Sequence, residues 1–302
     1  MAYPTSCFCI SIEVLCFFGV IILDVVLYEF TVLSKGGIQP FKRGFFCNDQ
    51  SIMKPYKSQS LTFAGLFSAG VVTSLAVIII HEVGNHFTKP KHTREPIFKE
   101  KKQFGVAKIP TFIIRMLHRM ALFITGFLAM LLFCDAVQLL TGRLRPHFLA
   151  VCKPNATLFN CSTGYITADV CTGDPLKIKY ARLSFPSIHT ASTAYSLVFI
   201  AICLQAIVYL RTLKIFRLLL QAVMFLLAIA VGLSRIKDNY HHWSDVVAGA
   251  LIGTFTAWLV AVKAMRLLDE PKPNLDYTML PISHDEEETT ETIEKDVKDL
   301  EK

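Results

Sequence analysis

The sequence predicts an all-α membrane protein, a bundle of six helices that each cross the bilayer. Three observations carry this prediction: 53% of the 302 residues are hydrophobic, only 18% are charged, and the apolar residues gather in six long runs. A helix rising about 1.5 Å per residue needs about 20 apolar residues to cross a hydrocarbon core of ~30 Å. The six runs, of which the fifth is the shortest, cover 7–33, 62–82, 116–139, 190–210, 216–233 and 244–265.

The first run, 7–33, differs from a signal peptide because it lacks a basic leader, is too long and shows no small-residue cleavage pattern. We therefore expect a retained span. Within it, Glu13 and Asp24 are eleven positions apart and project within about 20° of each other on one helical face. That face is expected to lie against the other helices, where the carboxylates make interhelical polar contacts or contribute to a lipid or proton path.

A change in composition near Glu270-Pro271 predicts one membrane domain, 1–268, followed by an acidic cytosolic tail, 269–302. Residues 285–302 hold nine acidic residues and three lysines, a net charge of −6, so about +13 remains on the rest of the chain. Such a tail is expected to be disordered. The basic residues elsewhere lie between apolar runs, without a basic domain interleaved with aromatic residues, which argues against a nucleic-acid partner.

Loop composition favours one orientation of the bundle. Six spans place both termini on one side together with loop 83–115, which holds eight Lys or Arg residues. The opposite side receives 34–61, 140–189 and 234–243, and its longest loop carries two glycosylation sequons, at Asn155 and Asn160. We therefore expect cytosolic termini and an extracellular or lumenal face for the polar loops.

The cysteines do not indicate a metal site, since none of the nine shows paired CxxC spacing. Four of them lie in polar loops on the side predicted to be extracellular or lumenal, so they form disulfides or stay free thiols, and their connectivity is left open. They are Cys47, Cys152, Cys161 and Cys171.

A polar segment between the fifth and sixth runs, 234–245, carries groups suited to phosphate chemistry. A helix that begins near His241 places Asp245 one turn on, where it can accept a hydrogen bond from one imidazole nitrogen and leave the other as nucleophile. Arg235 can bind phosphate oxygens. His242 points about 100° away and is expected to be an interfacial histidine. Taken alone, the segment is also typical of a polar cap on a membrane helix.

Two further segments are predicted to lie at the same membrane face. In 185–189, Pro186 and Ser187 can begin a helix whose free N–H groups favour an anion, and His189 is a candidate general acid. In 142–147, Arg145 follows the third run, where cations are also common membrane anchors. Each segment alone has an ordinary structural explanation. Together, the three loops bring two histidines, an aspartate and at least two arginines to one face, which predicts a phosphate-binding catalytic site.

These segments resemble the three signature motifs of the type 2 phosphatidic acid phosphatase superfamily, which includes vanadium haloperoxidases: Lys-x6-Arg-Pro, Pro-Ser-Gly-His and Ser-Arg-x5-His-x3-Asp. The third is matched in full by 234–245. Runs 43–49 and 142–149 are similar to animal lipid phosphate phosphatases, including the Wunen type, and the resemblance covers roughly 7–266. It implies a six-span bundle of the lipid phosphate phosphatase or haloperoxidase-like type in the plasma membrane. It also implies homo-oligomers and an outward-facing site that uses no metal or other cofactor.

The resemblance further implies hydrolysis of lipid phosphates, namely phosphatidate, lysophosphatidate, sphingosine 1-phosphate or ceramide 1-phosphate. His241 would be the nucleophile that forms a phosphohistidine, Asp245 its orienting partner and His189 the acid. The remaining motif positions would hold phosphate: Arg145, Arg235, Ser187, Gln138 and Ile188.

Two motif positions depart from the pattern. Gln138 stands where the first motif has Lys, so a charge-assisted contact worth ~1.5–3 kcal/mol is lost. Ile188 stands where the second has Gly, and its branched side chain would be strained if the site required a positive φ. The rival hypothesis is therefore a weakened or inactive lipid-binding relative. A transporter or channel would explain the six spans and Glu13/Asp24 but none of the histidines.

Overall fold

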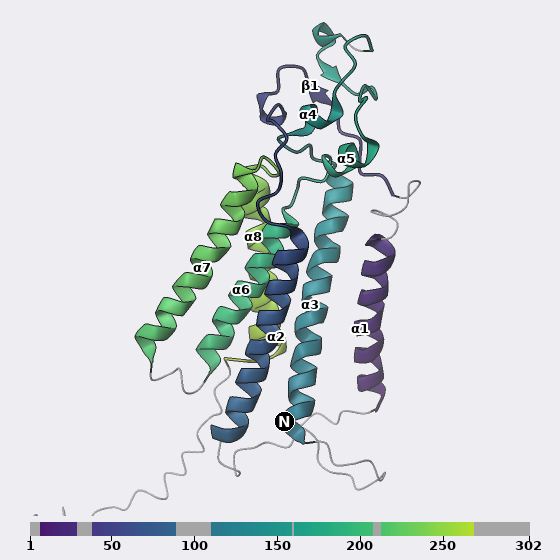
Figure 1. Ribbon diagram of the computed structural model, residues 1–302. Coiled ribbons are helices and arrows are strands. Elements are labelled where there is room, and N and C mark those ends of the chain that lie inside the picture. The colour runs from purple at the N-terminus through teal and green to yellow at the C-terminus, as the bar shows by residue number, and fades with distance from the viewer. Residues whose placement is uncertain (1–6, 29–37, 89–109, 159, 208–212, 269–302) are drawn as a thin grey trace, which may run out of the picture. The chain divides into compact units, whose positions relative to one another are not determined.

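The computed structural model describes residues 7–28, 38–88, 110–158, 160–207 and 213–268. The chain divides into two units, Met1–Leu268 and Asp269–Lys302, and every described residue belongs to the first. The predicted tail, 269–302, thus lies outside the described residues. The long helices run side by side (Figure 1) and are α1 (Cys7–Tyr28), α2 (Phe63–Thr88), α3 (Thr111–Thr141), α6 (Ile188–Ala206), α7 (Lys214–Lys237) and α8 (Trp243–Trp258).

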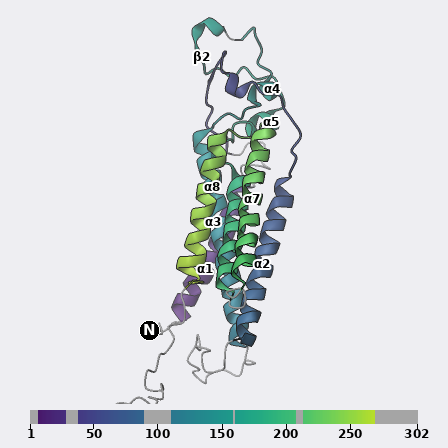
Figure 2. The ribbon, with the colours of Figure 1, turned by 90° about the vertical axis from the view of Figure 1, so that its left-hand side faces the viewer.

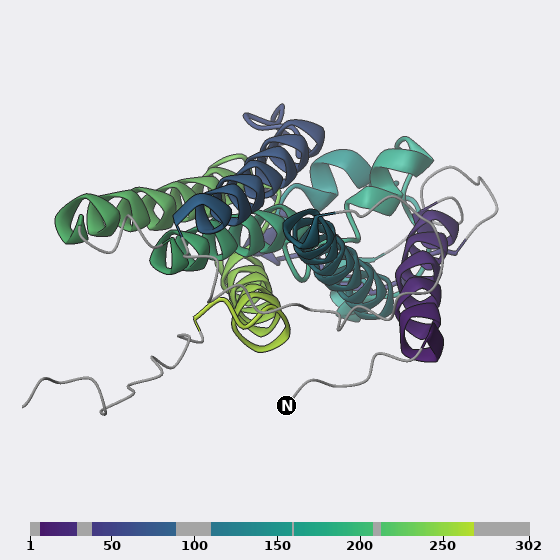
Figure 3. The same cartoon turned by 90° about the horizontal axis from the view of Figure 1, so that it is seen from below.

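Within the described residues, five helices are long and apolar enough to cross a membrane. They are α2, α3, α6, α7 and α8, the last continued by a π-helical turn, η6 (Leu259–Ala264). This confirms the predicted all-α membrane bundle. In α1, which lies beside α3 at one edge of the bundle (Figure 3), the apolar stretch Leu15–Val26 is shorter, so a count of six spans stays a prediction.

Helices α6 and α8 pack closely because two glycines of α8 face α6. A Cβ atom on Gly253 would lie 2.1 Å from the carbonyl oxygen of Ala191, and one on Gly249 would lie 2.4 Å from that of Ser187. Small residues four positions apart let membrane helices approach to backbone contact. The contact holds the start of α8 against the start of α6, so the second and third motif segments meet.

Aromatic side chains fill the middle of the bundle. Phe123, Phe127, Tyr195 and Phe199 are buried and in ring contact, and the Tyr195 hydroxyl donates to the carbonyl oxygen of Phe123 at 2.8 Å. This cluster joins α3 to α6. The segments that carry the motifs lie between this cluster and the cap end of the helices.

The loops 38–62 and 142–187, called the cap below, gather at one end of the helices (Figure 2). A small antiparallel sheet, which was not predicted, pairs β1 (Phe45–Phe46) with β2 (Tyr165–Ile166). Disulfides join Cys47 to Cys161 and Cys152 to Cys171, which settles the connectivity that the sequence left open. The cap also holds α4 (Phe148–Cys152), α5 (Pro175–Tyr180) and the 3-10 turns η2 (Gln50–Ile52) and η4 (Cys161–Thr163).

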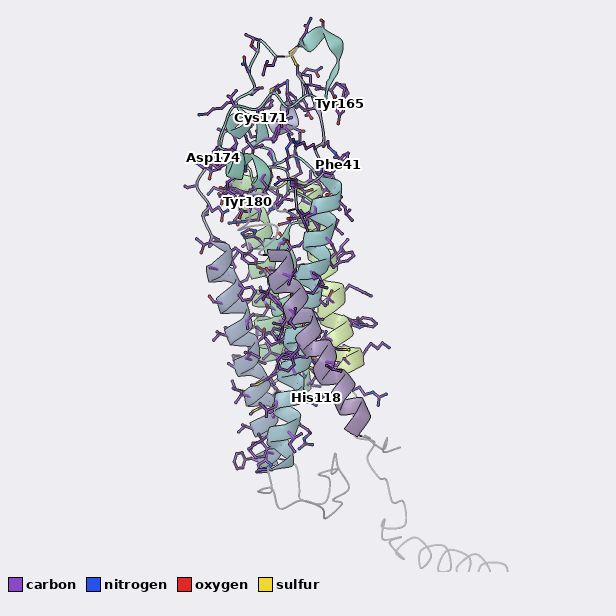
Figure 4. All side chains as sticks on the ribbon, turned by 90° about the vertical axis from the view of Figure 1, so that its right-hand side faces the viewer. Phe41, His118, Tyr165, Cys171, Asp174 and Tyr180 are labelled. Carbon is purple, nitrogen blue, oxygen red and sulfur yellow. A yellow bond between two sulfur atoms is a disulfide. The ribbon has the colours of Figure 1, made fainter. Side chains whose placement is uncertain are left out.

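Figure 4 shows Tyr165, Cys171, Asp174 and Tyr180 in the cap, with His118 near the opposite end of the helices. The cap has an apolar core of its own around Phe148, Cys152 and Val170. This core and the two disulfides hold the segments of the cap together over the ends of the helices.

Candidate active site

A cavity of about 660 Å³ opens where the cap meets α1, α2 and α3. Five of the predicted site residues line it: Gln138, Arg145, Ile188, His189 and His241. Its deeper wall is mostly apolar and includes Phe67, Leu128 and Leu131. The cavity therefore joins a basic outer end to an apolar interior, as an amphiphilic ligand requires.

His241 lies in the turn between α7 and α8 and is only 1% exposed. Its Nδ1 is 2.8 Å from the carbonyl oxygen of Ser184. Because a carbonyl can only accept, Nδ1 carries the proton in the neutral ring and Nε2 carries the lone pair. Nε2 is buried and has no hydrogen-bond partner within the described chain. This is the state of a nucleophile that awaits an electrophile.

His189 is the second residue of α6 and faces His241, with 6.3 Å between the ring centroids. Its Nε2 is also buried without a partner in the described part of the protein, and its ring meets Phe63 edge to face. The two histidines therefore flank one end of the cavity, His189 from the start of α6 and His241 from the turn between α7 and α8. A group placed between them can contact both rings.

Asp245 is fully buried in the first turn of α8 and is held by three donors. They are the Ser184 hydroxyl at 2.6 Å, the His242 backbone N–H at 2.9 Å and the Arg143 guanidinium at 2.6 Å. Its Oδ2 lies 3.9 Å from Nδ1 of His241, which is beyond hydrogen-bond distance. The predicted direct bond is thus replaced by Ser184, whose carbonyl holds His241 and whose hydroxyl holds Asp245.

The two predicted arginines differ in position. Arg145 lines the cavity, bonds the carbonyl oxygen of Leu183 through Nε and Nη2, and lies over the Tyr240 ring at 5.4 Å. Arg235 is fully buried, bonds the carbonyl oxygen of Leu61 and is absent from the cavity wall. Arg145 is therefore the arginine that can meet a ligand in this conformation.

The remaining predicted residues surround the start of α6. Ser187 is the N-cap, and its hydroxyl is bonded to Thr190 rather than turned into the cavity. The Gln138 amide donates to the carbonyl oxygen of Pro186 at 2.7 Å. Ile188 is helical and has no positive φ, so the strain considered for a residue replacing Gly does not arise.

Burial lowers the pKa of the basic groups at the outer end of the cavity, His241 and Arg145. Burial and, to a smaller extent, the charge of Arg145 lower the pKa of His241 to about 4, although Asp245 acts in the opposite direction. Burial also lowers the pKa of Arg145 to about 10, so this side chain remains a cation at neutral pH. The outer end thus offers a neutral imidazole beside a fixed positive charge. Among the described residues, no three His, Cys, Asp or Glu side chains cluster as metal ligands.

Comparison with known proteins gives the family. Phospholipid phosphatase 1 of Rattus norvegicus is 35% identical over 247 residues, which are 80% of this chain and 83% of that protein. Phospholipid phosphatase 2 of the same species is 34% identical over 220 residues, 73% of this chain and 75% of the relative. The PAP2 superfamily model matches residues 119–268. The chain belongs to the PAP2 superfamily.

A Drosophila melanogaster protein whose name includes the words phosphatidate phosphatase is also similar to this PAP2 chain, at 34% identity over 279 residues, 88% of this chain and 74% of the relative. No solved structure matches. The predicted family is confirmed, as is the enzyme class, a phosphoric monoester hydrolase of the phosphatidate phosphatase type.

Sequence reasoning missed several residues of the PAP2 cavity. Tyr240 and His147 lie within or beside the motif segments, and both line the cavity. His147 Nδ1 is 2.8 Å from the carbonyl oxygen of Asn239, and burial lowers the pKa of His147 to about 4. Asp135 lies one turn before Gln138, a spacing that could have identified it. Tyr56 and Lys177 also line the cavity, and they lie in cap segments that contain none of the three motifs.

Proposed function

We propose that this protein is an integral membrane lipid phosphate phosphatase that hydrolyses phosphomonoester lipids without a metal ion. The observation that carries the proposal is the unpartnered Nε2 of His241, which shares one cavity with His189 and Arg145. The substrates considered are phosphatidate, lysophosphatidate, sphingosine 1-phosphate and ceramide 1-phosphate. The test is release of inorganic phosphate from these lipids in detergent, with a chelator present.

The proposed reaction has two steps. In the first, the lone pair of His241 Nε2 forms a bond to phosphorus, the ester P–O bond breaks, and protonated His189 gives its proton to the leaving alkoxide. In the second, the oxygen of a water molecule attacks phosphorus while neutral His189 takes a proton from that water. The P–N bond to His241 breaks, and phosphate is released. Arg145 stabilises the charge on the phosphoryl oxygens, while Ser184 and Asp245 keep the His241 ring oriented.

We propose the roles of the individual phosphate-binding residues from their positions around the cavity. We assign Arg145 a direct contact, and we assign Arg235 and Ser187 the support of the turn and helix start that present His241 and His189. Gln138 and Ile188 form part of the wall. The phosphatase domain is 1–268, and the tail 269–302 lies outside it.

The orientation is proposed from the cap. Two disulfides favour an oxidising compartment, so the cap and the cavity mouth face the extracellular or lumenal side. We further propose cytosolic termini and residence in the plasma membrane. In the same cap Asn155 is half-buried and Asn160 is exposed. We expect glycosidase treatment to reduce the apparent mass of the expressed protein. An Asn155→Gln, Asn160→Gln double variant should run at the reduced mass without treatment, and a wild-type chain that shows no shift would contradict this orientation.

A second candidate function is a lipid-binding relative without turnover, favoured by Gln138 and Ile188 at two motif positions. It predicts lipid binding with no phosphate release. Under it, Gln138→Lys combined with Ile188→Gly should create activity, whereas under the proposed function the wild-type chain already releases phosphate.

A further inference from the structure

The cavity contains two carboxylates that the proposed reaction does not use. Asp24 of α1 and Asp135 of α3 both line it, together with His241 and His189. Oδ2 of Asp24 is buried without a hydrogen-bond partner, and neither carboxylate has an ion pair within the described residues. The same cavity holds the 1% exposed His241, whose Nε2 also lacks a partner there. The carboxylates and Nε2 of His241 are therefore both available to bind a ligand.

One of the two carboxylates, that of Asp135, lies deeper than the outer end of the cavity. Asp135 precedes Gln138 by three residues on α3, so it is about 4.5 Å further along the helix axis and on the same face. Arg145, after the end of α3, lies at the outer end, and the apolar residues Leu128 and Leu131 lie deeper. Going inward, the cavity is therefore cationic, then anionic, then apolar.

That order matches the order of groups in one class of lipid. A long-chain amino-alcohol phosphate carries a phosphate, then an ammonium group two carbon atoms from the ester oxygen, then an alkyl chain. With its phosphate between Arg145 and His241, its ammonium group would reach the level one helical turn deeper. A carboxylate in an apolar cavity is costly unless it is paired, and a ligand ammonium group supplies the pair.

We propose that Asp24 and Asp135 form an ammonium-binding subsite that makes long-chain amino-alcohol phosphates the preferred substrates. The inference rests on the proposed phosphatase function and names the substrate class of the same cavity. It also accounts for Gln138. A lysine at position 138 would lie three residues from Asp135 and pair with it, whereas glutamine bonds the carbonyl oxygen of Pro186 and leaves the carboxylate to the ligand.

The test compares two substrates with the same phosphate and the same alkyl chain that differ in the group at nitrogen, one charged and one neutral. Sphingosine 1-phosphate carries an ammonium group, and its N-acetyl derivative carries a neutral amide. Full-length protein in detergent is expected to show kcat/KM at least about tenfold higher for the amine, the size of one charge-assisted contact. Asp24→Asn and Asp135→Asn should each bring this ratio close to one, mainly through KM for the amine. Gln138→Lys should also lower this ratio, because the new lysine would pair with Asp135.

Two variants control for folding and for general charge. Asp24→Glu retains the carboxylate and should retain the preference. Asp169→Asn removes an exposed carboxylate that pairs with Lys42 in the cap, outside the cavity, and should leave the ratio unchanged. The melting temperature of each variant shows whether it is folded.

The outcomes separate this inference from the proposed function. Turnover of both substrates with equal kcat/KM in wild type, or a ratio that Asp24→Asn and Asp135→Asn leave unchanged, overturns the subsite and leaves the phosphatase intact. Turnover of neither substrate overturns the phosphatase. In that case the Kd of each lipid decides the subsite: equal Kd values, or a preference that survives Asp135→Asn, overturn it as well.

Discussion

Replacing His241 by alanine is expected to abolish the release of inorganic phosphate from lipid phosphates. The Ser184 carbonyl holds the proton of His241 on Nδ1, so the lone pair that attacks phosphorus in the proposed reaction lies on Nε2 of this ring and is lost with it. Loss of a nucleophile lowers kcat by at least about 10³-fold. The measurement is phosphate release under substrate saturation, with the variant compared with wild type in the same detergent.

Two further variants make this result specific. His241→Asn keeps a donor that can bond the Ser184 carbonyl, so it should remain folded and still be inactive. His118→Ala removes an exposed histidine near the opposite end of the helices (Figure 4) and should retain full activity. Activity of His241→Asn within tenfold of wild type would exclude His241 as the nucleophile.

The same histidine gives the sign of a pH effect. Since the pKa of His241 is lowered to about 4 from 6.5, the neutral nucleophile persists down to about pH 4. The unfolded chain binds this proton more readily than the folded chain. The contribution of His241 to stability is therefore complete above about pH 6.5 and is lost as the pH falls from there toward 4. The melting temperature of His241→Asn should fall less over this window than that of wild type.

Replacing Gly253 by alanine is expected to destroy the α6–α8 contact and most of the activity with it. The new Cβ would lie 2.1 Å from the carbonyl oxygen of Ala191 and 3.0 Å from the backbone nitrogen of Tyr195, and backbone atoms cannot move aside as side chains do. Overpacking of this kind costs typically 1–3 kcal/mol and more where backbone resists. The readouts are melting temperature and phosphate release, both of which should fall sharply.

The matched control is Gly19→Ala in α1, where an added Cβ meets nothing within 4 Å. It makes the same chemical change within a helix, and the higher helix propensity of alanine should leave stability equal or slightly increased. If Gly253→Ala melted at the temperature of Gly19→Ala, the close approach of α6 and α8 would not be required for the fold.

The membrane bundle could be predicted because apolar run length is a direct consequence of bilayer thickness. The meeting of His189, His241 and Arg145 was also predictable, since each follows or precedes a span at the same face. The structure of the cap was harder to predict from the sequence. Its two-residue strands and its cysteine pairing depend on contacts between residues far apart in sequence, such as Phe45 with Ile166, which no local pattern reports.

Within the site, the sequence predicted residue types better than contacts. Helical spacing placed Asp245 one turn from His241, but the helix begins at Trp243, so the carboxylate meets Ser184 and Arg143 instead. The motifs grouped Arg235 with Arg145 as phosphate-binding residues. In the structure, Arg235 lies in the last turn of α7 and bonds the carbonyl oxygen of Leu61. Asp135 was overlooked because it lies within an apolar run and outside the motif segments, although it is only one helical turn from Gln138.

The Cys47–Cys161 disulfide has a consequence for the connectivity of the chain. Cys47 precedes α2 and Cys161 follows α3, so the bond closes a covalent ring that contains both of these helices. A single cut anywhere between the two cysteines leaves the two pieces joined. The segments that carry Tyr56 and Arg145 therefore remain part of one covalent molecule after such a cut.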